Sequence, residues 1–257
     1  MLFKDPLVQK KFEEVGIVKL PLLSHNQVSV LSEFVKSNTP ILELANKYGF
    51  IQGVCIKDRP VKLELDSFIR ELITPLCKQH LTGFKALIYT ALAKAPGNNS
   101  ELDLHQDWSL VDESKYCSIS LWIPLIDSVI ENGAVHVLKG SHKKYLNPRG
   151  GSIPSISFSD KEVLKKKMIP MEMKAGEAIF FDQRLLHYSP NNKCENTRIS
   201  IISSLVPEEA EVYQYYQPES GALEVYRMTD DFFMNYDDFV VEKELRPKGI
   251  KVTDFEI

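Results

Sequence analysis

The chain has 257 residues, of which 44% are hydrophobic and 26% are charged, a composition typical of a folded globular protein. Its formal net charge of −4 argues against a surface built to bind nucleic-acid phosphates. The opening segment is too charged for a secretory signal, and no later stretch is long and apolar enough to span a bilayer. We therefore expect a cytoplasmic protein whose partners include neither nucleic acid nor a membrane.

The length fits one domain, so we expect residues 1–257 to fold as a single unit. The four cysteines, Cys55, Cys77, Cys117 and Cys194, are far apart and form no CxxC pair. This spacing indicates reduced thiols and disfavours both a disulfide framework and a cysteine-ligated metal.

Residues 1–83 are predicted to form mainly helical support for the rest of the chain. Capping residues or prolines precede apolar residues at helical spacing, which is the usual signal for the start of an amphipathic helix. In chain order we expect a helix from Asp5-Pro6 to Gly16, a strand over Ile17–Leu23, a helix after Ser24, a helix from Thr39-Pro40 to Gly49 and a helix around Leu65–Leu76.

Residues 84–205 show short β-rich runs that are separated by Gly, Pro and Asn. The runs are Phe84–Lys94, Tyr116–Pro124, Ala134–Leu138, Ala178–Asp182 and Arg198–Leu205. Their rhythm predicts a mainly β fold, a β-sandwich or jelly roll with helices packed on one side. Residues 206–257 contain many aromatic side chains, so we expect them to be a C-terminal extension that packs against the sheet.

Two histidines and one carboxylate form the candidate metal site. His105 and Asp107 are two residues apart, which places both side chains on the same face of an extended segment. His187 follows the apolar run AIFFD further along the chain. Together they match the facial triad of non-haem iron(II) oxygenases, although an HxD tripeptide alone arises by chance in many chains.

The run Arg198-Ile199-Ser200-Ile201 alternates polar and apolar residues, so Arg198 and Ser200 share one face of the predicted strand. A guanidinium group matches a carboxylate such as the distal carboxylate of 2-oxoglutarate. The alternation alone is equally compatible with Arg198 facing solvent and pairing with a surface acid such as Glu195.

Two further strands carry polar residues on one face. Trp122 shares a face with Ser118 and Ser120, where it either forms the wall of a cofactor pocket or fills the core. In the run Phe84–Lys94, Thr90 and Lys94 also share a face.

The chain contains, in this order, the segments LHQDWSLVDE, SLWIPLID, ENGAVHVLKGSH, AGEAIFFDQRLLHYSPNN and TRISI. From about Phe84 to Leu205 this pattern resembles the phytanoyl-CoA dioxygenase family of iron(II)- and 2-oxoglutarate-dependent oxygenases. The resemblance implies a double-stranded β-helix, with iron(II) at His105, Asp107 and His187 as the catalytic centre. It also implies that 2-oxoglutarate is anchored by Arg198 with help from Ser200, Thr90 and Trp122.

The resemblance further implies an enzyme that uses O2 to hydroxylate an unactivated C–H bond of a small-molecule substrate, with release of succinate and CO2. Position 107 is Asp and not Gly or Ala, so no coordination site is vacated for chloride and hydroxylation is expected instead of halogenation. The run Lys165–Lys167 is interpreted as a solvated face, so an acyl-CoA substrate is not carried over from the family.

Five residues are predicted to contact the substrate: Gln106, Trp108, Arg149, Arg184 and Tyr188. Two other functions compete with the oxygenase. One is a non-catalytic β-helix module for binding or regulation, which has no physical need for an intact triad and a paired arginine. The other is a cupin-like metal enzyme that does not use 2-oxoglutarate, which would not require Arg198.

Overall fold

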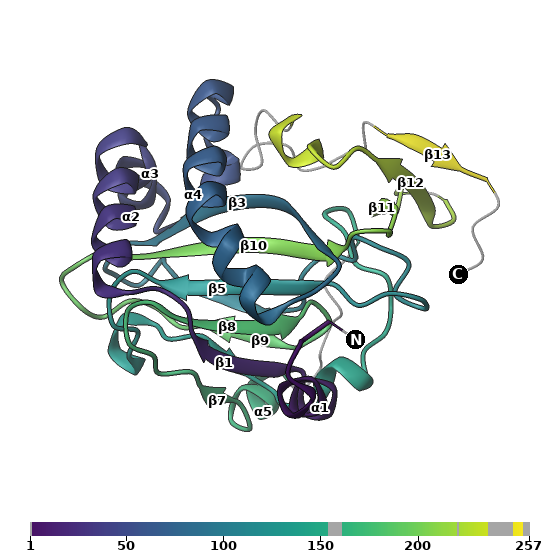
Figure 1. Cartoon of the computed structure of the whole chain (residues 1–257), viewed down its shortest axis with the longest axis horizontal. Helices are drawn as coiled ribbons and strands as arrows, with labels where there is room; N and C mark the ends of the chain where they lie inside the picture. The colour runs from purple at the N-terminus through teal and green to yellow at the C-terminus, as the bar shows by residue number, and fades with distance from the viewer. Residues whose placement is uncertain (1, 154–160, 220, 236–248, 254–257) are drawn as a thin grey trace.

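Two antiparallel sheets of different size face each other, and helices cover the outer face of the larger one (Figure 1). The structure is a computed structural model that describes residues 2–153, 161–219, 221–235 and 249–253. The larger sheet has the strand order β1-β8-β5-β10-β3-β2, and the smaller sheet has the order β4-β9-β6-β7. This arrangement confirms the predicted jelly-roll fold with flanking helices.

The strands of the larger sheet are β1 (Ile17–Pro21), β2 (Phe50–Gln52), β3 (Phe84–Lys94), β5 (Ile119–Pro124), β8 (Glu177–Asp182) and β10 (Arg198–Pro207). Those of the smaller sheet are β4 (Leu102–His105), β6 (His136–Val137), β7 (Ile169–Pro170) and β9 (His187–Ser189). Every neighbouring pair in both sheets is antiparallel.

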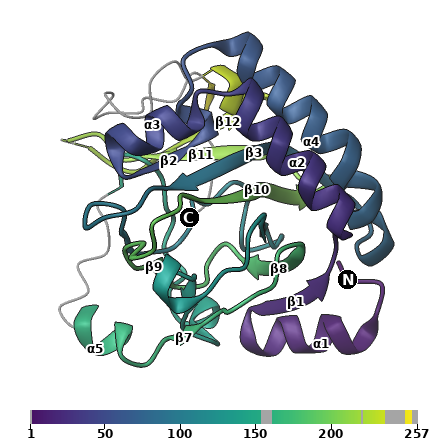
Figure 2. The ribbon, with the colours of Figure 1, turned by 90° about the vertical axis from the view of Figure 1, so that its left-hand side faces the viewer.

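The helices are α1 (Pro6–Val15), α2 (His25–Asn38), α3 (Ile41–Tyr48), α4 (Arg59–His80) and α5 (Lys161–Lys165). Short 3-10 helices are η1 (Gly53–Cys55), η2 (Ile130–Asn132), η3 (Ser141–Lys143) and η4 (Phe232–Asn235). The predicted caps are present: the Asp5 carboxylate accepts the backbone N–H of Leu7, and Ser24 forms a capping box with Gln27. Figure 2 shows α2, α3 and α4 over one side of the larger sheet, with β7 and β9 on the other side.

The residues of each central strand alternate between two different environments. Ile199 and Ile201 of β10 belong to the core cluster that includes the buried faces of α2 and α4. Trp122 of β5 and Leu92 of β3 belong to a second cluster, together with Val137 of the smaller sheet. The polar faces predicted for β3, β5 and β10 therefore point into the space between the two sheets.

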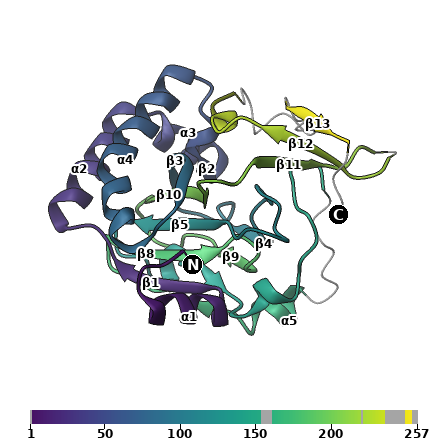
Figure 3. The same ribbon diagram turned by 45° about the vertical axis from the view of Figure 1, so that its right-hand side comes forward.

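The C-terminal residues form a third sheet, built from β11 (Val212–Tyr216), β12 (Glu224–Met228) and β13 (Ile250–Val252) (Figure 3). Between β12 and β13, η4 lies against α4 and β3. The predicted C-terminal packing thus takes the form of a separate sheet and one short helix. The segments 236–248 and 254–257 of this extension lie outside the described residues.

Several sequence expectations differ from the structure. The N-terminal third supplies both edge strands of the larger sheet, and β2 is not among the predicted strands. The runs Tyr116–Pro124 and Ala134–Leu138 contain strands shorter than expected, and β4, β7 and β9 were not predicted. These strands have two to four residues, too few for alternation to identify them. None of the helices in the described ranges combines the length and apolar character needed to cross a membrane.

The packing of α4 on the larger sheet gives a first prediction. Ile69 of α4 is fully buried, so Ile69→Ala should lower the free energy of unfolding by about 2–5 kcal/mol. The matched control is Leu63→Ala on the same helix, where 40% of the side chain is exposed and the cost should be about 1 kcal/mol or less. Urea unfolding followed by circular dichroism measures both, and equal losses would contradict this packing.

Candidate active site

The register between β4 and β9 brings the predicted metal ligands together. His105 pairs directly with His187 across the two strands, and the ring centroids lie 4.1 Å apart. Asp107 follows β4, and its Oδ1 lies 3.8 Å from His105 Nε2 and 3.7 Å from His187 Nε2. One potential ligand atom of each residue lies within 4.8 Å of the other two, so a single ion could contact all three.

Hydrogen bonds to backbone carbonyls fix the orientation of both imidazoles. His105 Nδ1 lies 2.7 Å from the Asp103 carbonyl oxygen, and His187 Nδ1 lies 2.9 Å from that of Leu185. A carbonyl can only accept, so each Nδ1 carries the proton and each Nε2 keeps its lone pair for a metal.

The protonation state of His105 also suits a metal ligand. Burial and the neighbouring His187 lower the pKa of His105 to about 4. About 30% of the His105 side chain is still accessible, because it borders a cavity. The neutral imidazole is therefore present at physiological pH without metal having to displace a proton.

Asp107 is held from three directions. The Ser120 hydroxyl of β5 donates to Asp107 Oδ2 at 2.5 Å, which leaves Oδ1 directed at the histidines. The backbone N–H of Asp107 donates to the Gln183 carbonyl at 3.0 Å. Its own carbonyl accepts from Arg149 Nε at 2.7 Å, and Arg149 forms a two-pronged ion pair with Glu113. These contacts orient the carboxylate before any metal binds.

The Ser120 contact predicts a loss of metal affinity. Ser120→Ala frees Asp107 Oδ2, so the dissociation constant for iron(II) should rise about 10- to 100-fold. Ser118→Ala is the matched control, because Ser118 is also buried and its hydroxyl has no hydrogen-bond partner among the described residues. Anaerobic calorimetric titration with iron(II) measures both variants, and equal effects would show that Ser120 does not position the ligand.

Arg198 lies in the interior and not at the surface. Its side chain is fully buried, its guanidinium carbon lies 5.3 Å from the centre of the Trp122 ring, and it donates to the Gly133 carbonyl. Among the described residues it forms no ion pair, and its Nε has no hydrogen-bond partner. Burial lowers the Arg198 pKa to about 9. The interior orientation is confirmed, and the alternative of a surface pair with Glu195 is wrong.

Other polar groups gather around Arg198. Ser200, on the same face of β10, is fully buried, and its hydroxyl has no partner among the described residues. Ser189 Oγ of β9 lies 3.5 Å from Arg198 Nη2. Lys94 pairs with Arg198 across β3 and β10, and its ammonium donates to three backbone carbonyls. Burial and the nearby Arg198 lower the Lys94 pKa to about 7.

These groups fit the iron and cosubstrate of an oxygenase. Two imidazole nitrogens and one carboxylate are a donor set that suits iron(II). A buried cation such as Arg198, without an ion-pair partner among the described residues, is costly to maintain, and an anionic ligand would compensate it. The carboxylate of 2-oxoglutarate has the required charge and can accept from both Arg198 and Ser200.

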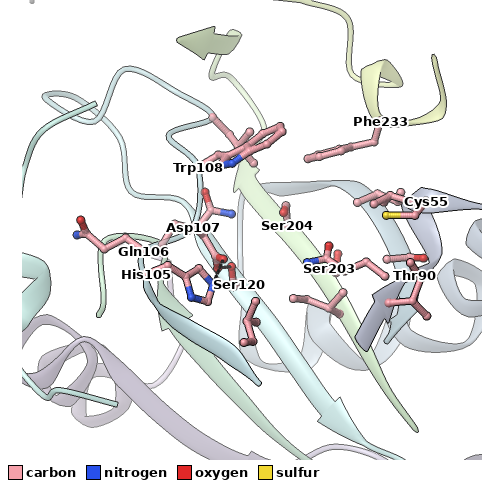
Figure 4. A pocket seen from close by; sticks show the side chains of 18 of the residues that line it. Cys55, Thr90, His105, Gln106, Asp107, Trp108, Ser120, Ser203, Ser204 and Phe233 are labelled. Atoms are coloured by element: carbon pink, nitrogen blue, oxygen red, sulfur yellow. Dashed lines mark hydrogen bonds and ion pairs between the residues drawn. The ribbon is translucent and has the colours of Figure 1, made fainter. Parts of the chain in front are cut away.

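A cavity of about 420 Å³ opens beside the triad (Figure 4). His105 and Asp107 form part of its wall, together with the predicted cosubstrate residue Thr90. Arg198, Ser200 and Trp122 are not among its lining residues. The cavity therefore reaches two of the three metal-ligand candidates and Thr90, but it does not extend to Arg198.

The five predicted substrate contacts separate into two groups. Gln106 and Trp108 line the cavity, although the Gln106 side chain points away from it and donates to the Tyr145 and Arg184 carbonyls. Arg149, Arg184 and Tyr188 are not lining residues. Arg149 is bound to Glu113 and Asp107, Arg184 is ion-paired with Asp182 at 2.6 Å, and Tyr188 packs on the His136 ring. Their charges and rings thus have partners elsewhere.

Four residues near the site were not singled out from the sequence as site residues: Ser120, Ser189, Gln183 and Phe233. Ser120 and Ser189 had a local signal, because each lies two residues from a predicted site residue on the same strand face. Gln183 and Phe233 had none, since the cavity assembles them from distant segments.

Known proteins share sequence with this chain. The phytanoyl-CoA dioxygenase (PhyH) family matches residues 34–200, so the chain belongs to that family. A Dictyostelium discoideum phytanoyl-CoA dioxygenase domain-containing protein 1 homolog is 32% identical over 106 residues, which are 38% of each chain. Phytanoyl-CoA dioxygenase of Arabidopsis thaliana is 33% identical over 41% of this chain and 38% of its own length. The match thus spans about two fifths of these relatives.

Solved structures share the fold at low sequence identity. The epimerase SnoN, crystallised with Fe3+, alpha ketoglutarate and nogalamycin RO, superposes with a TM-score of 0.57 at 16% identity over 97% of both chains. The alpha ketoglutarate dependent carbocyclase SnoK from nogalamycin biosynthesis gives a TM-score of 0.56 at 17% identity, covering 81% of this chain and 86% of its own.

Proposed function

We propose that this protein is an iron(II)- and 2-oxoglutarate-dependent oxygenase that hydroxylates an unactivated C–H bond of a small molecule. The observation that carries the proposal is the combination of the His105–Asp107–His187 triad with the buried, unpaired Arg198. A metal enzyme that does not use 2-oxoglutarate, or a binding module, has no need for both. Membership of the phytanoyl-CoA dioxygenase family supports the same class.

Each group of the site has a separate task in this proposal. His105, Asp107 and His187 hold iron(II), which with 2-oxoglutarate and O2 supplies the oxidising chemistry that releases succinate and CO2. Arg198 and Ser200 bind the distal carboxylate of 2-oxoglutarate, and Trp122 covers one face of the Arg198 guanidinium. Because three protein ligands are present, no position is vacated for chloride, and hydroxylation is the expected outcome.

The names of these relatives contain phytanoyl-CoA. We do not propose an acyl-CoA substrate for this chain. Lys165, in the lysine run, is ion-paired with Glu101 at 2.8 Å and Asp103 at 3.0 Å. A lysine so engaged is not free for the phosphates of coenzyme A.

The decisive test of 2-oxoglutarate binding is Arg198→Met, which removes the positive charge but keeps a long, unbranched side chain. The dissociation constant for 2-oxoglutarate should rise about 10- to 100-fold, because a charge-assisted hydrogen bond to a buried group is lost. Iron(II) affinity should be unchanged, and the ligand-free protein should be at least as stable, since a buried unpaired charge is gone.

Anaerobic calorimetry on iron-loaded protein measures the dissociation constant of 2-oxoglutarate in Arg198→Met and in the wild type. The control is Arg70→Met, because Arg70 lies on α4 and is paired with Asp66 at 2.9 Å, away from the interior. An unchanged 2-oxoglutarate affinity in Arg198→Met would overturn the cosubstrate assignment while leaving the metal site intact.

The lowered pKa of Lys94 predicts how 2-oxoglutarate binding depends on pH. With a pKa of about 7, Lys94 is mostly neutral above pH 7 in the ligand-free protein. An anion bound beside Arg198 favours the ammonium form, so binding takes up a proton. The dissociation constant of 2-oxoglutarate should therefore rise from pH 7 to pH 9 by up to about tenfold per pH unit.

Calorimetry in two buffers of different protonation enthalpy measures the proton uptake directly. Lys94→Met should weaken binding at pH 7 and abolish the uptake. Wild-type affinity that does not vary with pH, or an equal slope in Lys94→Met, would contradict the role assigned to this lysine.

A further inference from the structure

The cavity wall carries almost no charge. Apart from His105 and Asp107, the described residues that line it include no Lys, Arg, Asp or Glu. Its polar side chains are amides and hydroxyls such as Gln52, Thr90 and Ser204. A charged group in this space would lose its hydration without gaining a counter-ion, which strongly disfavours an ionic substrate.

The far wall is apolar, and the C-terminal extension contributes Phe233 to it. Phe233 of η4 packs with Val54, Ile88 and Leu110, and Trp108 packs against the same cluster. Figure 4 shows the Trp108 and Phe233 rings at the same end of the cavity, Trp108 above Asp107 and Phe233 above Cys55. An apolar part of a ligand placed there would contact two aromatic surfaces.

One buried polar atom beside the cavity lacks a hydrogen-bond partner among the described residues. Gln183 lines the cavity with only 1% of its surface exposed, and its Oε1 has no hydrogen-bond partner among the described residues. Gln183 is also fixed beside the triad, because its carbonyl accepts the backbone N–H of Asp107 at 3.0 Å. A buried amide oxygen without a partner costs free energy that a hydrogen-bond donor on the substrate would recover.

We infer that the substrate is an uncharged, largely apolar small molecule that contacts Trp108 and Phe233 and donates a hydrogen bond to the amide of Gln183. This inference rests on the proposed function, since it concerns the substrate of that same site. It makes Phe233, which lies far from the triad in sequence, a determinant of specificity.

Three probes with the same ring system test the inference: 1-naphthol, 1-methylnaphthalene and naphthalene-1-sulfonate. They present, respectively, a neutral donor, no donor and an anion. Anaerobic protein loaded with iron(II) and 2-oxoglutarate is titrated with 1-naphthol, whose emission from the neutral form rises in an apolar cavity that suppresses proton loss to water. The other two probes are measured by displacement of 1-naphthol.

The expected order is 1-naphthol, then 1-methylnaphthalene about two- to tenfold weaker, then naphthalene-1-sulfonate at least about tenfold weaker again. Phe233→Ala should weaken both neutral probes about tenfold, and Phe233→Leu should weaken them less. Gln183→Met should remove the advantage of 1-naphthol over 1-methylnaphthalene. Phe34→Ala is the control, because it truncates a phenylalanine that stacks on Phe68 outside the cavity and should change none of these values.

Tight binding of the sulfonate, no saturable binding of any probe, or equal losses in Phe233→Ala and Phe34→Ala would each overturn the inference. Circular dichroism checks that each variant is folded, and Gln183→Met tests the site without altering the aromatic wall. Calorimetry on the same samples reports 2-oxoglutarate binding separately. If the probes bind in the expected order but the protein does not bind 2-oxoglutarate, the proposed function is overturned. The inference about the cavity would still hold.

Discussion

The antiparallel register of β4 and β9 is the constraint on which the site depends. It sets His105 directly opposite His187, and Asp107 then reaches both imidazoles because it follows β4 by two residues. A shift of one residue in this pairing would turn one histidine to the other face of the sheet. The two strands have only four and three residues, and contacts to Asp107 from other segments also hold this part of the chain.

Those contacts come from the larger sheet and from loops that connect strands. Ser120 of β5 binds the Asp107 carboxylate, and Arg149 joins the Asp107 backbone to Glu113. The helices on the outer face pack against the same central strands. The proposed metal ligands thus lie on a scaffold of protein contacts, and side chains fix the loop after β4.

Much of the site could be predicted from the sequence because its signals are local. The two-residue alternation in β10 and β5 correctly put Arg198 with Ser200, and Ser120 with Trp122, on shared strand faces, and the structure turns these faces inward. Contacts between distant segments left no such signal. Arg149 was expected to meet the substrate, but its ion pair with Glu113 depends on a loop conformation that no periodicity encodes.

The contacts of the C-terminal extension could not be predicted from the sequence either. Its aromatic content predicted packing, but the sequence could not show that η4 brings Phe233 to the cavity beside the triad. Strand β9 has only three residues and was not predicted, although its residue His187 was predicted as a metal ligand.

The central claim is that the triad and the interior around Arg198 form one site for iron(II) and 2-oxoglutarate. The most direct measurement is the visible absorption of anaerobic iron(II)-loaded protein during titration with 2-oxoglutarate. A weak charge-transfer band from a keto acid chelated to iron(II) is expected in the wild type and should be absent in Asp107→Ala. Bound iron(II) that gives no band with saturating 2-oxoglutarate would contradict the account.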